Sequence, residues 1–431
     1  MSGSANLDAE ILAIGKDLAA AFPKAGRRPL KALDDKAMDL AAQDAELKAA
    51  LFRFVDVVPA CRNLDDLARH LTSFLDEVDN KPPPLKAAMK MADSAAGRKA
   101  LGAASAAGVR HMAHRFIVGE TPKDALPVFR QLWKRGIRTS VDLLGEATVT
   151  QDEAERYARR CHEALDQLAA ADPDANLSVK VSALTPLLRP DAPERGKNDA
   201  KPRLRALLEH AQQVGAHLHI DMESLDSREA ITDLVLELLA EPEFADGPST
   251  GMVLQAYLRD ATDLLDRMLA FTRSTTREHP LVVRLVKGAY LDHEVVEARQ
   301  HGWTSPVFEE KAESDRTFEH LTRRLLDARS HGISPAIASH NLRSVAHAIA
   351  YNRHLGAPDD ALEFQVLRGL GDDLQDALNA RGHVVRTYCP VGDLVAGMAY
   401  LVRRLLENTA NDSFLSDVAS GRPLDELLAA P

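Results

Sequence analysis

The amino-acid sequence predicts an α/β fold, a (β/α)8 TIM-like barrel that follows an N-terminal helical region. From about Thr121 onward, eight short β-branched segments alternate with amphipathic segments of helix length, the order that such a barrel requires. The first of these segments is followed by GEATVT, without the GxGxxG turn of a doubly wound nucleotide-binding sheet. A chain of 431 residues is long enough for a large barrel and an additional lobe.

Residues 1–118 are predicted to form a helical arm and a helical lobe. Pro82, Pro83 and Pro84 interrupt this region, because consecutive prolines cannot continue a helix. The region carries no clear chemistry, so we interpret it as packing on the barrel or on another subunit. Its apolar stripes at helical spacing are Leu7, Ile11, Ile14, Leu18 and Phe22; Leu40, Leu47, Leu51, Phe54 and Val55; and Leu64, Leu67, Leu71, Phe74 and Leu75.

The barrel is expected to span residues 119–418, followed by a C-terminal tail at 419–431. Its predicted strands are 139–145, 177–183, 217–223, 251–257, 282–288, 336–340, 363–368 and 384–389. The predicted helices between them include 122–135, 152–170, 202–214, 261–272 and 344–355.

Polar side chains gather near the ends of the predicted strands, and barrels of this kind carry their active sites at the C-terminal strand ends. These side chains are Asp142, Glu146, Lys180, Asp221, Glu223, Gln255, Tyr257, Arg284, Lys287, His340, Asn341, Gln365, Arg368, Arg386 and Tyr388. Parallel strands are buried on both faces, so Lys180 and Arg284 within apolar strands each need a partner or a function. Several such charges on successive strands favour a functional site.

A predicted helix beyond the last strand adds further cations. Tyr400, Arg404 and Glu407 fall on one face at helical spacing, and Arg403 adjoins them. Two adjacent guanidiniums suit a small carboxylate, which each planar fork can bind with two hydrogen bonds. Taken alone, the pattern also fits a solvated surface helix.

Charge and composition restrict the classes of partner and the cellular location that are compatible with the sequence. A net charge of −11 argues against nucleic acid. The three cysteines have no paired spacing, which favours a reduced, cytoplasmic location. No apolar run could span a bilayer and no signal pattern opens the chain, while contact with a membrane surface stays open. No metal is expected, because His217, His219 and His340 lack neighbouring ligands.

Five segments together resemble the proline dehydrogenase family, most closely the proline dehydrogenase part of bifunctional proline utilization A. They are RLVKGAYLDHE (284–294), SHN (339–341), EFQVLRGLGD (363–372), YCPVG (388–392) and YLVRRLLENTANDSF (400–414). The resemblance implies a distorted (β/α)8 barrel that binds FAD noncovalently. It also implies oxidation of L-proline to Δ1-pyrroline-5-carboxylate, the first step of proline catabolism, with electrons passed to a membrane quinone.

The resemblance further implies roles for individual residues. The expected catalytic residues are Arg284, Lys180, Asp221 and Tyr388. The expected substrate contacts are Lys180, Arg403, Arg404, Tyr290, Leu367 and Tyr388, with Glu146 paired to Arg403 as a gate. The expected FAD contacts are Asp221, Gln255, Arg284, Lys287, Gly288, Ala289, Ser339, His340, Asn341, Gln365, Arg404, Glu407 and Phe414.

Two other functions stay open from the residues themselves. One is a Schiff-base barrel such as an aldolase, with Lys180 or Lys287 as the reactive amine. The other is an inactive barrel that serves as an assembly module, and a homo-oligomer is compatible with the helical region. The sequence contains neither a Rossmann fingerprint nor a nucleophilic cysteine motif for a second dehydrogenase. It is therefore either part of a bifunctional chain or a relative with one activity.

Overall fold

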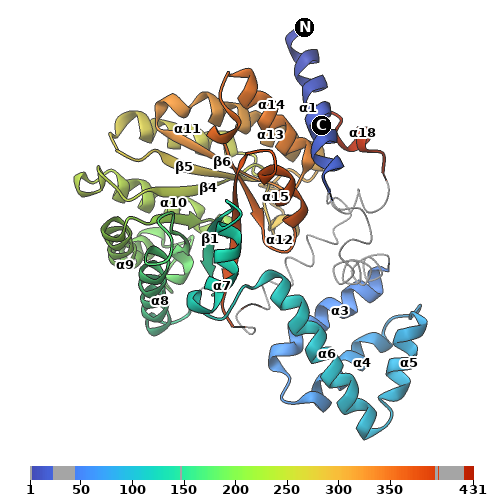
Figure 1. The fold of residues 1–431 in the computed structure, drawn as a ribbon. Helices are drawn as coiled ribbons and strands as arrows, with labels where there is room; N and C mark the ends of the chain where they lie inside the picture. Colours follow the sequence, from blue (N-terminus) through green and yellow to red (C-terminus); the bar gives the residue numbers. More distant parts are fainter. Residues whose placement is uncertain (1, 23–43, 146–147, 394–396, 398–421) are drawn as a thin grey trace.

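A computed structural model describes residues 2–22, 44–145, 148–393, 397 and 422–431, and its centre is a closed barrel of eight parallel strands (Figure 1). The strands pair in sequence order, and β1 closes the barrel against β8 with a register from Arg138–Arg386 to Leu143–Val391. The predicted (β/α)8 fold is confirmed. None of the described helices is both long and apolar enough to cross a bilayer.

All eight predicted strands are present. Their bounds are β1 (Arg138–Leu143), β2 (Asn176–Lys180), β3 (His217–Asp221), β4 (Thr250–Gln255), β5 (Leu281–Val286), β6 (Ile333–Ala338), β7 (Glu363–Leu367) and β8 (Val384–Val391). Strand β6 begins at Ile333, earlier than predicted. The prediction started the strand after Pro335, because proline donates no hydrogen bond to a neighbouring strand, but Pro335 lies within β6 and is paired in register with Val283. Strand β2 ends at Lys180, since residues Val181–Ala183 form the 3-10 turn η2.

Helices surround the barrel (Figure 1). They are α7 (Pro122–Trp133), α8 (Gln151–Ala169), α9 (Pro193–Val214), α10 (Leu225–Leu239), α11 (Ala261–Ser274), α12 (Leu291–His301), α13 (Lys311–Asp327), α14 (Leu342–His354) and α15 (Asp372–Asn379). Thr121 and Thr150 start α7 and α8 with reciprocal capping boxes. The helix predicted at 202–214 starts at Pro193, which sits in the first turn, where the missing N–H is not needed.

Four helices form a separate lobe with its own apolar cluster: α3 (Ala45–Val57), α4 (Leu64–Asp76), α5 (Pro83–Met91) and α6 (Ala95–Phe116). Its core includes Leu67, Leu71 and Phe116, and it extends to Leu144 and Tyr388 at the ends of β1 and β8. The Val118 N–H donates to the Pro390 carbonyl at 2.9 Å. The lobe therefore packs beside the mouth of the barrel.

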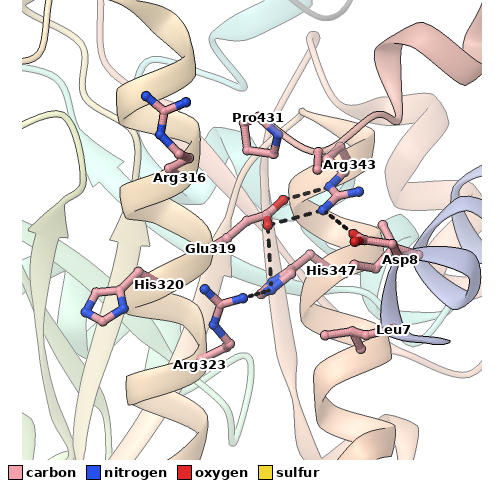
Figure 2. A pocket seen from close by; sticks show the side chains of 11 residues that line it. Leu7, Asp8, Arg316, Glu319, His320, Arg323, Arg343, His347 and Pro431 are labelled. Atoms are coloured by element: carbon pink, nitrogen blue, oxygen red, sulfur yellow. Dashed lines mark hydrogen bonds and ion pairs between the residues drawn. The ribbon is translucent and has the colours of Figure 1, made fainter. Parts of the chain in front are cut away.

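Helix α1 (Ser2–Ala20) lies apart from this lobe and packs on α14. Its contact carries a polar network around a cavity of about 380 Å³ (Figure 2). The Arg343 guanidinium donates to Glu319 at 2.7 Å and to Asp8 at 3.0 Å. Both Arg343 and Glu319 are buried, so this ion pair joins α13 and α14 while Asp8 attaches α1.

Arg386 lies at the N-terminal end of the barrel, which corrects its predicted place at the active-site rim. Its guanidinium donates to Glu363 at 3.0 Å, to Asp174 at 3.0 Å and to the Thr139 carbonyl at 2.9 Å. Glu363 begins β7 and Asp174 precedes β2, so all these partners lie at strand starts. Sequence analysis assigned Arg386 to the wrong end of the barrel. Arg386 and Tyr388 point to the same face of β8, but Arg386 lies two residues closer to the N-terminal end of the strand.

Acid should weaken this cluster. Burial alone would raise the pKa of Glu363, but Arg386 outweighs it and lowers the pKa from 4.5 to about 2. The resulting stabilisation, at most about 3 kcal/mol, is complete above the unfolded pKa and is lost as pH falls toward the folded pKa. Between about pH 5.5 and about pH 3.5, the free energy of unfolding in urea should fall about 1 kcal/mol more in the parent than in Glu363→Gln. Equal slopes would contradict this assignment.

Candidate active site

The C-terminal mouth of the barrel contains a buried ion pair between adjacent strands. Lys180, the last residue of β2, contacts the carboxylate of Asp142 on β1. Lys180 is 7% exposed and Asp142 is 1% exposed. Burial alone would lower the pKa of Lys180, but the charges of Asp142, Asp221 and Glu223 outweigh it and raise that pKa above its ordinary value. Lys180 therefore presents a permanent positive charge to the mouth.

Arg284 on β5 connects strands from both sides of the barrel. Its guanidinium donates to Asp221 on β3 at 2.5 Å and to Gln365 on β7 at 2.6 Å. Its third nitrogen reaches the hydroxyls of Ser178 at 3.2 Å and Ser140 at 3.3 Å. Because four strands hold it, this buried cation has one fixed position inside the barrel.

Tyr388 on β8 completes this arrangement. Its hydroxyl donates to the second oxygen of Asp221 at 2.7 Å, and the Arg284 guanidinium lies 5.3 Å from its ring centroid. Burial, followed by the charges of Asp142 and Asp221, raises the pKa of the Tyr388 hydroxyl, which therefore stays protonated as a donor. Asp221 thus orients both Arg284 and Tyr388.

A second tier of small polar side chains supports the cations. The Ser140 hydroxyl donates to Asn176 at 2.7 Å, and the Tyr157 hydroxyl accepts the Lys180 backbone N–H at 3.2 Å.

His219 is fully buried, and its Nε2 has no hydrogen-bond partner. Burial and the charge of Arg284 hold the pKa of His219 well below its usual range, so its imidazole is neutral. A Cβ at position 251 would lie 2.2 Å from this ring, which explains Gly251.

The turn after β5 carries the predicted cofactor-binding residues Lys287, Gly288 and Ala289. Lys287 contacts Asp315, which also accepts from Lys311 at 2.6 Å. Burial alone would raise the pKa of Asp315, but the two lysines outweigh it and lower that pKa. Gly288 has a φ of 143°, and a Cβ there would lie 2.4 Å from the ring of Tyr257, so only glycine fits.

The ends of β6 and β7 are tied to each other. The Nε2 atom of His340 accepts the Leu367 N–H at 2.9 Å, which fixes the neutral tautomer of the ring with its proton on Nδ1. Asn341 caps α14 by accepting the Ser344 N–H at 3.0 Å, and the Ser339 hydroxyl accepts the Asn341 N–H at 3.1 Å. These three residues of the SHN segment shape the turn between β6 and α14.

The remaining predicted site residues fall into two groups. Gln255 is buried at the end of β4, and Tyr290 is the residue before α12. Leu367 ends β7 and is paired in register with Tyr388. Glu146, Arg403, Arg404, Glu407 and Phe414 lie outside the described residues, so their roles stay predictions.

Sequence analysis placed Asp142 near the strand ends without giving it a role, and it did not single out Ser140 and Ser178. Asp142 was noted as polar but was not recognised as the partner of Lys180. Strand alternation places Ser140 and Asp142 on one face of β1, and Ser178 and Lys180 on one face of β2. Side chains two residues apart on a strand point to the same face. Looking two residues before each charged strand position would therefore have indicated these residues.

The structure is therefore a closed (β/α)8 barrel with fixed, buried cations at its C-terminal mouth. A family model described as Proline dehydrogenase matches residues 125–417, and one described as Proline utilization A N-terminal domain matches residues 8–116. The chain belongs to the proline dehydrogenase family.

Curated relatives include the Bifunctional protein PutA of Salmonella typhimurium, which is 35% identical over 340 residues. That match covers 75% of this chain and 25% of the relative, so the chain spans about a quarter of that protein. Proline dehydrogenase 1 of Bacillus subtilis subsp. natto is 28% identical over 315 residues, covering 72% of this chain and 92% of the relative.

Solved structures agree with the fold. Proline utilization A from Bdellovibrio bacteriovorus, inactivated by N-propargylglycine, has a TM-score of 0.89 and 34% identity, covering 99% of this chain and 44% of that one. Proline utilization A from Bradyrhizobium japonicum, as a D778Y mutant, has a TM-score of 0.77 and 28% identity, covering 99% of this chain and 46% of that one.

Proposed function

We propose that this protein oxidises L-proline to Δ1-pyrroline-5-carboxylate with noncovalently bound FAD and passes the electrons to a quinone. The observation that carries the proposal is the pair of buried cations, Lys180 and Arg284, held at the barrel mouth of a proline dehydrogenase family member. Lys180 supplies charge for the substrate carboxylate, and Arg284 supplies charge for a group that becomes negative during the reaction. A quinone partner and contact with a membrane surface are part of the proposal.

The chemistry of the donor set fits FAD. Arg284 is held inside the barrel by side chains of four other strands, and Lys287 lies in the turn before α12. Helix α12 begins without a side-chain cap on Tyr290, so the N–H groups of its first turn can serve a diphosphate. Bound FAD would supply the acceptor for the hydride that the ring carbon of proline loses on oxidation. The chain would hold it through the predicted contacts in this turn, in the SHN segment and at Gln255 and Gln365.

The residues of the mouth would position proline rather than react with it. The ammonium of Lys180 and the guanidiniums of Arg403 and Arg404 would bind the carboxylate, and three cations around one carboxylate would restrict the orientation of the ring. Tyr388, with its hydroxyl engaged by Asp221, would present its ring to the substrate. Tyr290 and Leu367 would complete the apolar wall, and Glu146 would pair with Arg403 when no substrate is bound.

The Schiff-base alternative fits the geometry poorly. An amine that attacks a carbonyl needs a lowered pKa so that it is neutral near pH 7. The pKa of Lys180 is raised by Asp142 and the neighbouring carboxylates. Burial lowers the pKa of Lys287, the direction that a Schiff base needs, but the Asp315 carboxylate opposes that shift and pairs with the Lys287 ammonium.

The flavin should be released by acid. Cys161 and Cys389 are buried, Cys61 is partly buried in the helical lobe, and His340 uses its Nε2 to accept a backbone N–H. The buried thiols and this histidine nitrogen are therefore not presented for attachment to a flavin. Precipitation of the purified yellow protein with trichloroacetic acid should leave the flavin in the supernatant. Flavin that stays in the pellet would contradict noncovalent binding, and colourless protein that oxidises proline would contradict the use of FAD.

Arg404→Met should raise the KM for proline by about tenfold to about a hundredfold, because a charged hydrogen bond contributes on the order of 1.5–3 kcal/mol. The assay measures proline-dependent reduction of a soluble quinone and traps the product with o-aminobenzaldehyde. Parent protein that contains flavin but oxidises no proline would overturn the proposed function. An unchanged KM in Arg404→Met would remove only Arg404 from the carboxylate site.

A further inference from the structure

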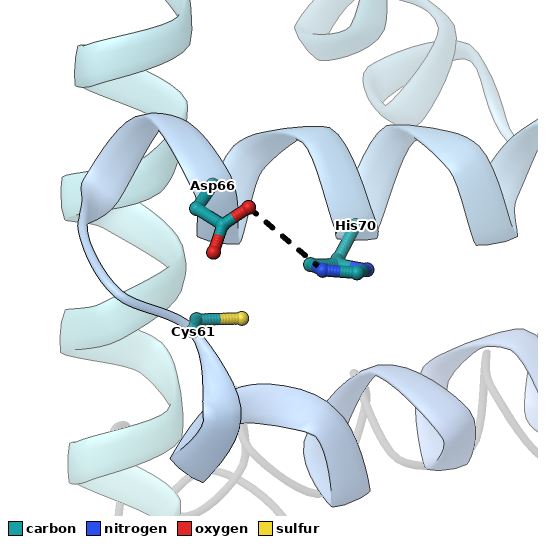
Figure 3. Close-up of side chains that lie close together, drawn as sticks. All are labelled: Cys61, Asp66 and His70. Atoms are coloured by element: carbon teal, nitrogen blue, oxygen red, sulfur yellow. Dashed lines mark ion pairs between the residues drawn. The ribbon is translucent and has the colours of Figure 1, made fainter.

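A group of three metal-ligating side chains lies in the helical lobe, where the 3-10 turn η1 (Val58–Ala60) leads into α4 (Figure 3). One ligand atom from each of Cys61, Asp66 and His70 lies within 4.8 Å of the other two. Across the described part of the chain, no other set of three histidine, cysteine, aspartate or glutamate residues meets this criterion. Nothing in the barrel chemistry uses these residues.

The local fold brings the three ligands together over ten residues of chain. Cys61 directly follows the 3-10 turn η1 (Val58–Ala60), and Asn63 caps α4 by accepting the Asp66 N–H at 2.9 Å. Asp66 and His70 stand one helical turn apart on the same face of α4. Few backbone angles separate the ligands, so little chain entropy is lost when they converge.

The backbone also orients the carboxylate. The Arg62 N–H donates to one oxygen of Asp66 at 3.1 Å, and the other oxygen lies 3.9 Å from Nε2 of His70. Figure 3 shows the Cys61 sulfur on the same side of α4 as these two groups. One carboxylate oxygen is thus held by the protein, while the second faces the histidine.

We propose that Cys61, Asp66 and His70 bind a divalent cation of the zinc class, with water as the fourth ligand. Sulfur, nitrogen and carboxylate oxygen are the donors that Zn²⁺ takes, at about 2.0–2.3 Å in tetrahedral geometry. Those bond lengths place ligand atoms roughly 3.3–3.8 Å apart. Side-chain rotations that move each ligand atom by less than about 1 Å would therefore bring all three ligands within bonding distance of one ion.

Access and charge agree with this assignment. All three side chains are partly exposed, so an ion can enter, whereas Cys161 and Cys389 are completely buried. The competing cation, Arg69, lies 3.7 Å from Asp66 but 3.2 Å from Asp65 and is 63% exposed, so it blocks the site weakly. On binding, the Cys61 thiol releases its proton to solvent and forms the metal–sulfur bond as a thiolate.

A bound ion would join the end of α3 to α4. Cys61 follows η1 directly after α3, and α4 packs against both α3 and α6. The hydrogen bond that the Cys61 thiol donates to the Val57 carbonyl at 3.5 Å would be exchanged for the metal–sulfur bond. The ion would therefore fix the corner on which the lobe is built and increase the stability of the lobe. Its role is structural, and the flavin and substrate chemistry does not depend on it.

Cobalt provides a direct test, because Co²⁺ replaces Zn²⁺ and absorbs light according to its ligands. Full-length protein with its flavin, reduced with a phosphine and freed of metal, is titrated with Co²⁺ and recorded as difference spectra. We expect one equivalent of Co²⁺ to give tetrahedral bands at wavelengths beyond the flavin absorption, with a sulfur-to-metal band in the near ultraviolet. One equivalent of Zn²⁺ should abolish both.

Matched variants identify the ligands. Cys61→Ser should remove the sulfur-to-metal band, and His70→Gln should weaken Co²⁺ binding at least tenfold. His114→Gln, a change at an exposed histidine on α6, should leave the spectra unchanged. Far-ultraviolet circular dichroism checks that each variant is folded. Should Cys61→Ser be unfolded, Asp66→Asn and the zinc competition in the parent decide the question.

Three results would overturn the proposal: no tetrahedral bands in the parent, a sulfur-to-metal band that survives Cys61→Ser, or loss of the bands in His114→Gln. Zinc should also raise the unfolding temperature of the parent but not of His70→Gln. A zinc effect of the same size in both proteins would show adventitious binding elsewhere.

Discussion

Arg284→Met is expected to lower kcat/KM for proline by at least about a hundredfold and to destabilise the barrel by about 3–5 kcal/mol. The stability loss arises because Asp221, which is 8% exposed, loses the guanidinium that pairs with it and is left buried without a compensating charge. The activity loss arises because a fixed positive charge is removed from the centre of the mouth. Unfolding in urea and steady-state kinetics measure the two effects.

Two controls separate structure from catalysis. The double variant Arg284→Met/Asp221→Asn removes both charges, so it should recover part of the lost stability without recovering activity. Arg386→Met removes an equally buried arginine from the other end of the barrel, where Glu363 and Asp174 hold it. It should destabilise the protein but leave the KM for proline unchanged. Arg284→Met with full activity would remove this residue from the reaction.

Lys180→Met should show the second large effect, a destabilisation of about 3–5 kcal/mol together with a KM for proline raised about tenfold or more. Asp142, at 1% exposure, would lose the ammonium that pairs with it and would be left buried without a partner. The carboxylate of proline would lose one of its three expected cations. Thermal unfolding and the proline–quinone assay measure the two quantities.

Lys197 on α9 is the matched control, because it is as buried as Lys180 but lies outside the mouth. Its partners Glu194 and Glu237 are 74% and 50% exposed, so water solvates them when the ammonium is removed. Lys197→Met should therefore cost about 1 kcal/mol or less and leave the KM unchanged. The double variant Lys180→Met/Asp142→Leu should regain stability while its KM stays high, and a normal KM there would exclude Lys180 from substrate binding.

The sequence was sufficient for the barrel and for the positions of its strands. Buried parallel strands are short apolar runs, and Val141, Leu177 and Leu218 illustrate such runs in β1, β2 and β3. Boundaries were less accurate, as at α9, where two prolines nine residues apart each resemble a helix start.

The candidate site was predictable only in part. Lys180 and Arg284 stood out because charge within an apolar strand is unfavourable. Their partners could not be read from neighbouring sequence, since Asp142 and Asp221 reach them across strands far apart along the chain. Arg386 was wrongly placed at the mouth. Strand alternation predicts the face to which its side chain points, but not whether it lies near the N-terminal or the C-terminal end of the barrel. The roles assigned by family resemblance, including those of Arg403 and Arg404, stay predictions.

The closure of β1 against β8 has a consequence for synthesis of the chain on the ribosome. Strand β1 is complete at Leu143, but the strand that covers its outer edge ends only at Val391. Until that late segment leaves the exit tunnel, β1 and β7 are both open edges, and such edges invite pairing with other nascent chains. The contact between β1 and β8 joins residues far apart along the chain, so it forms late. Completion of the barrel therefore depends on the last strand.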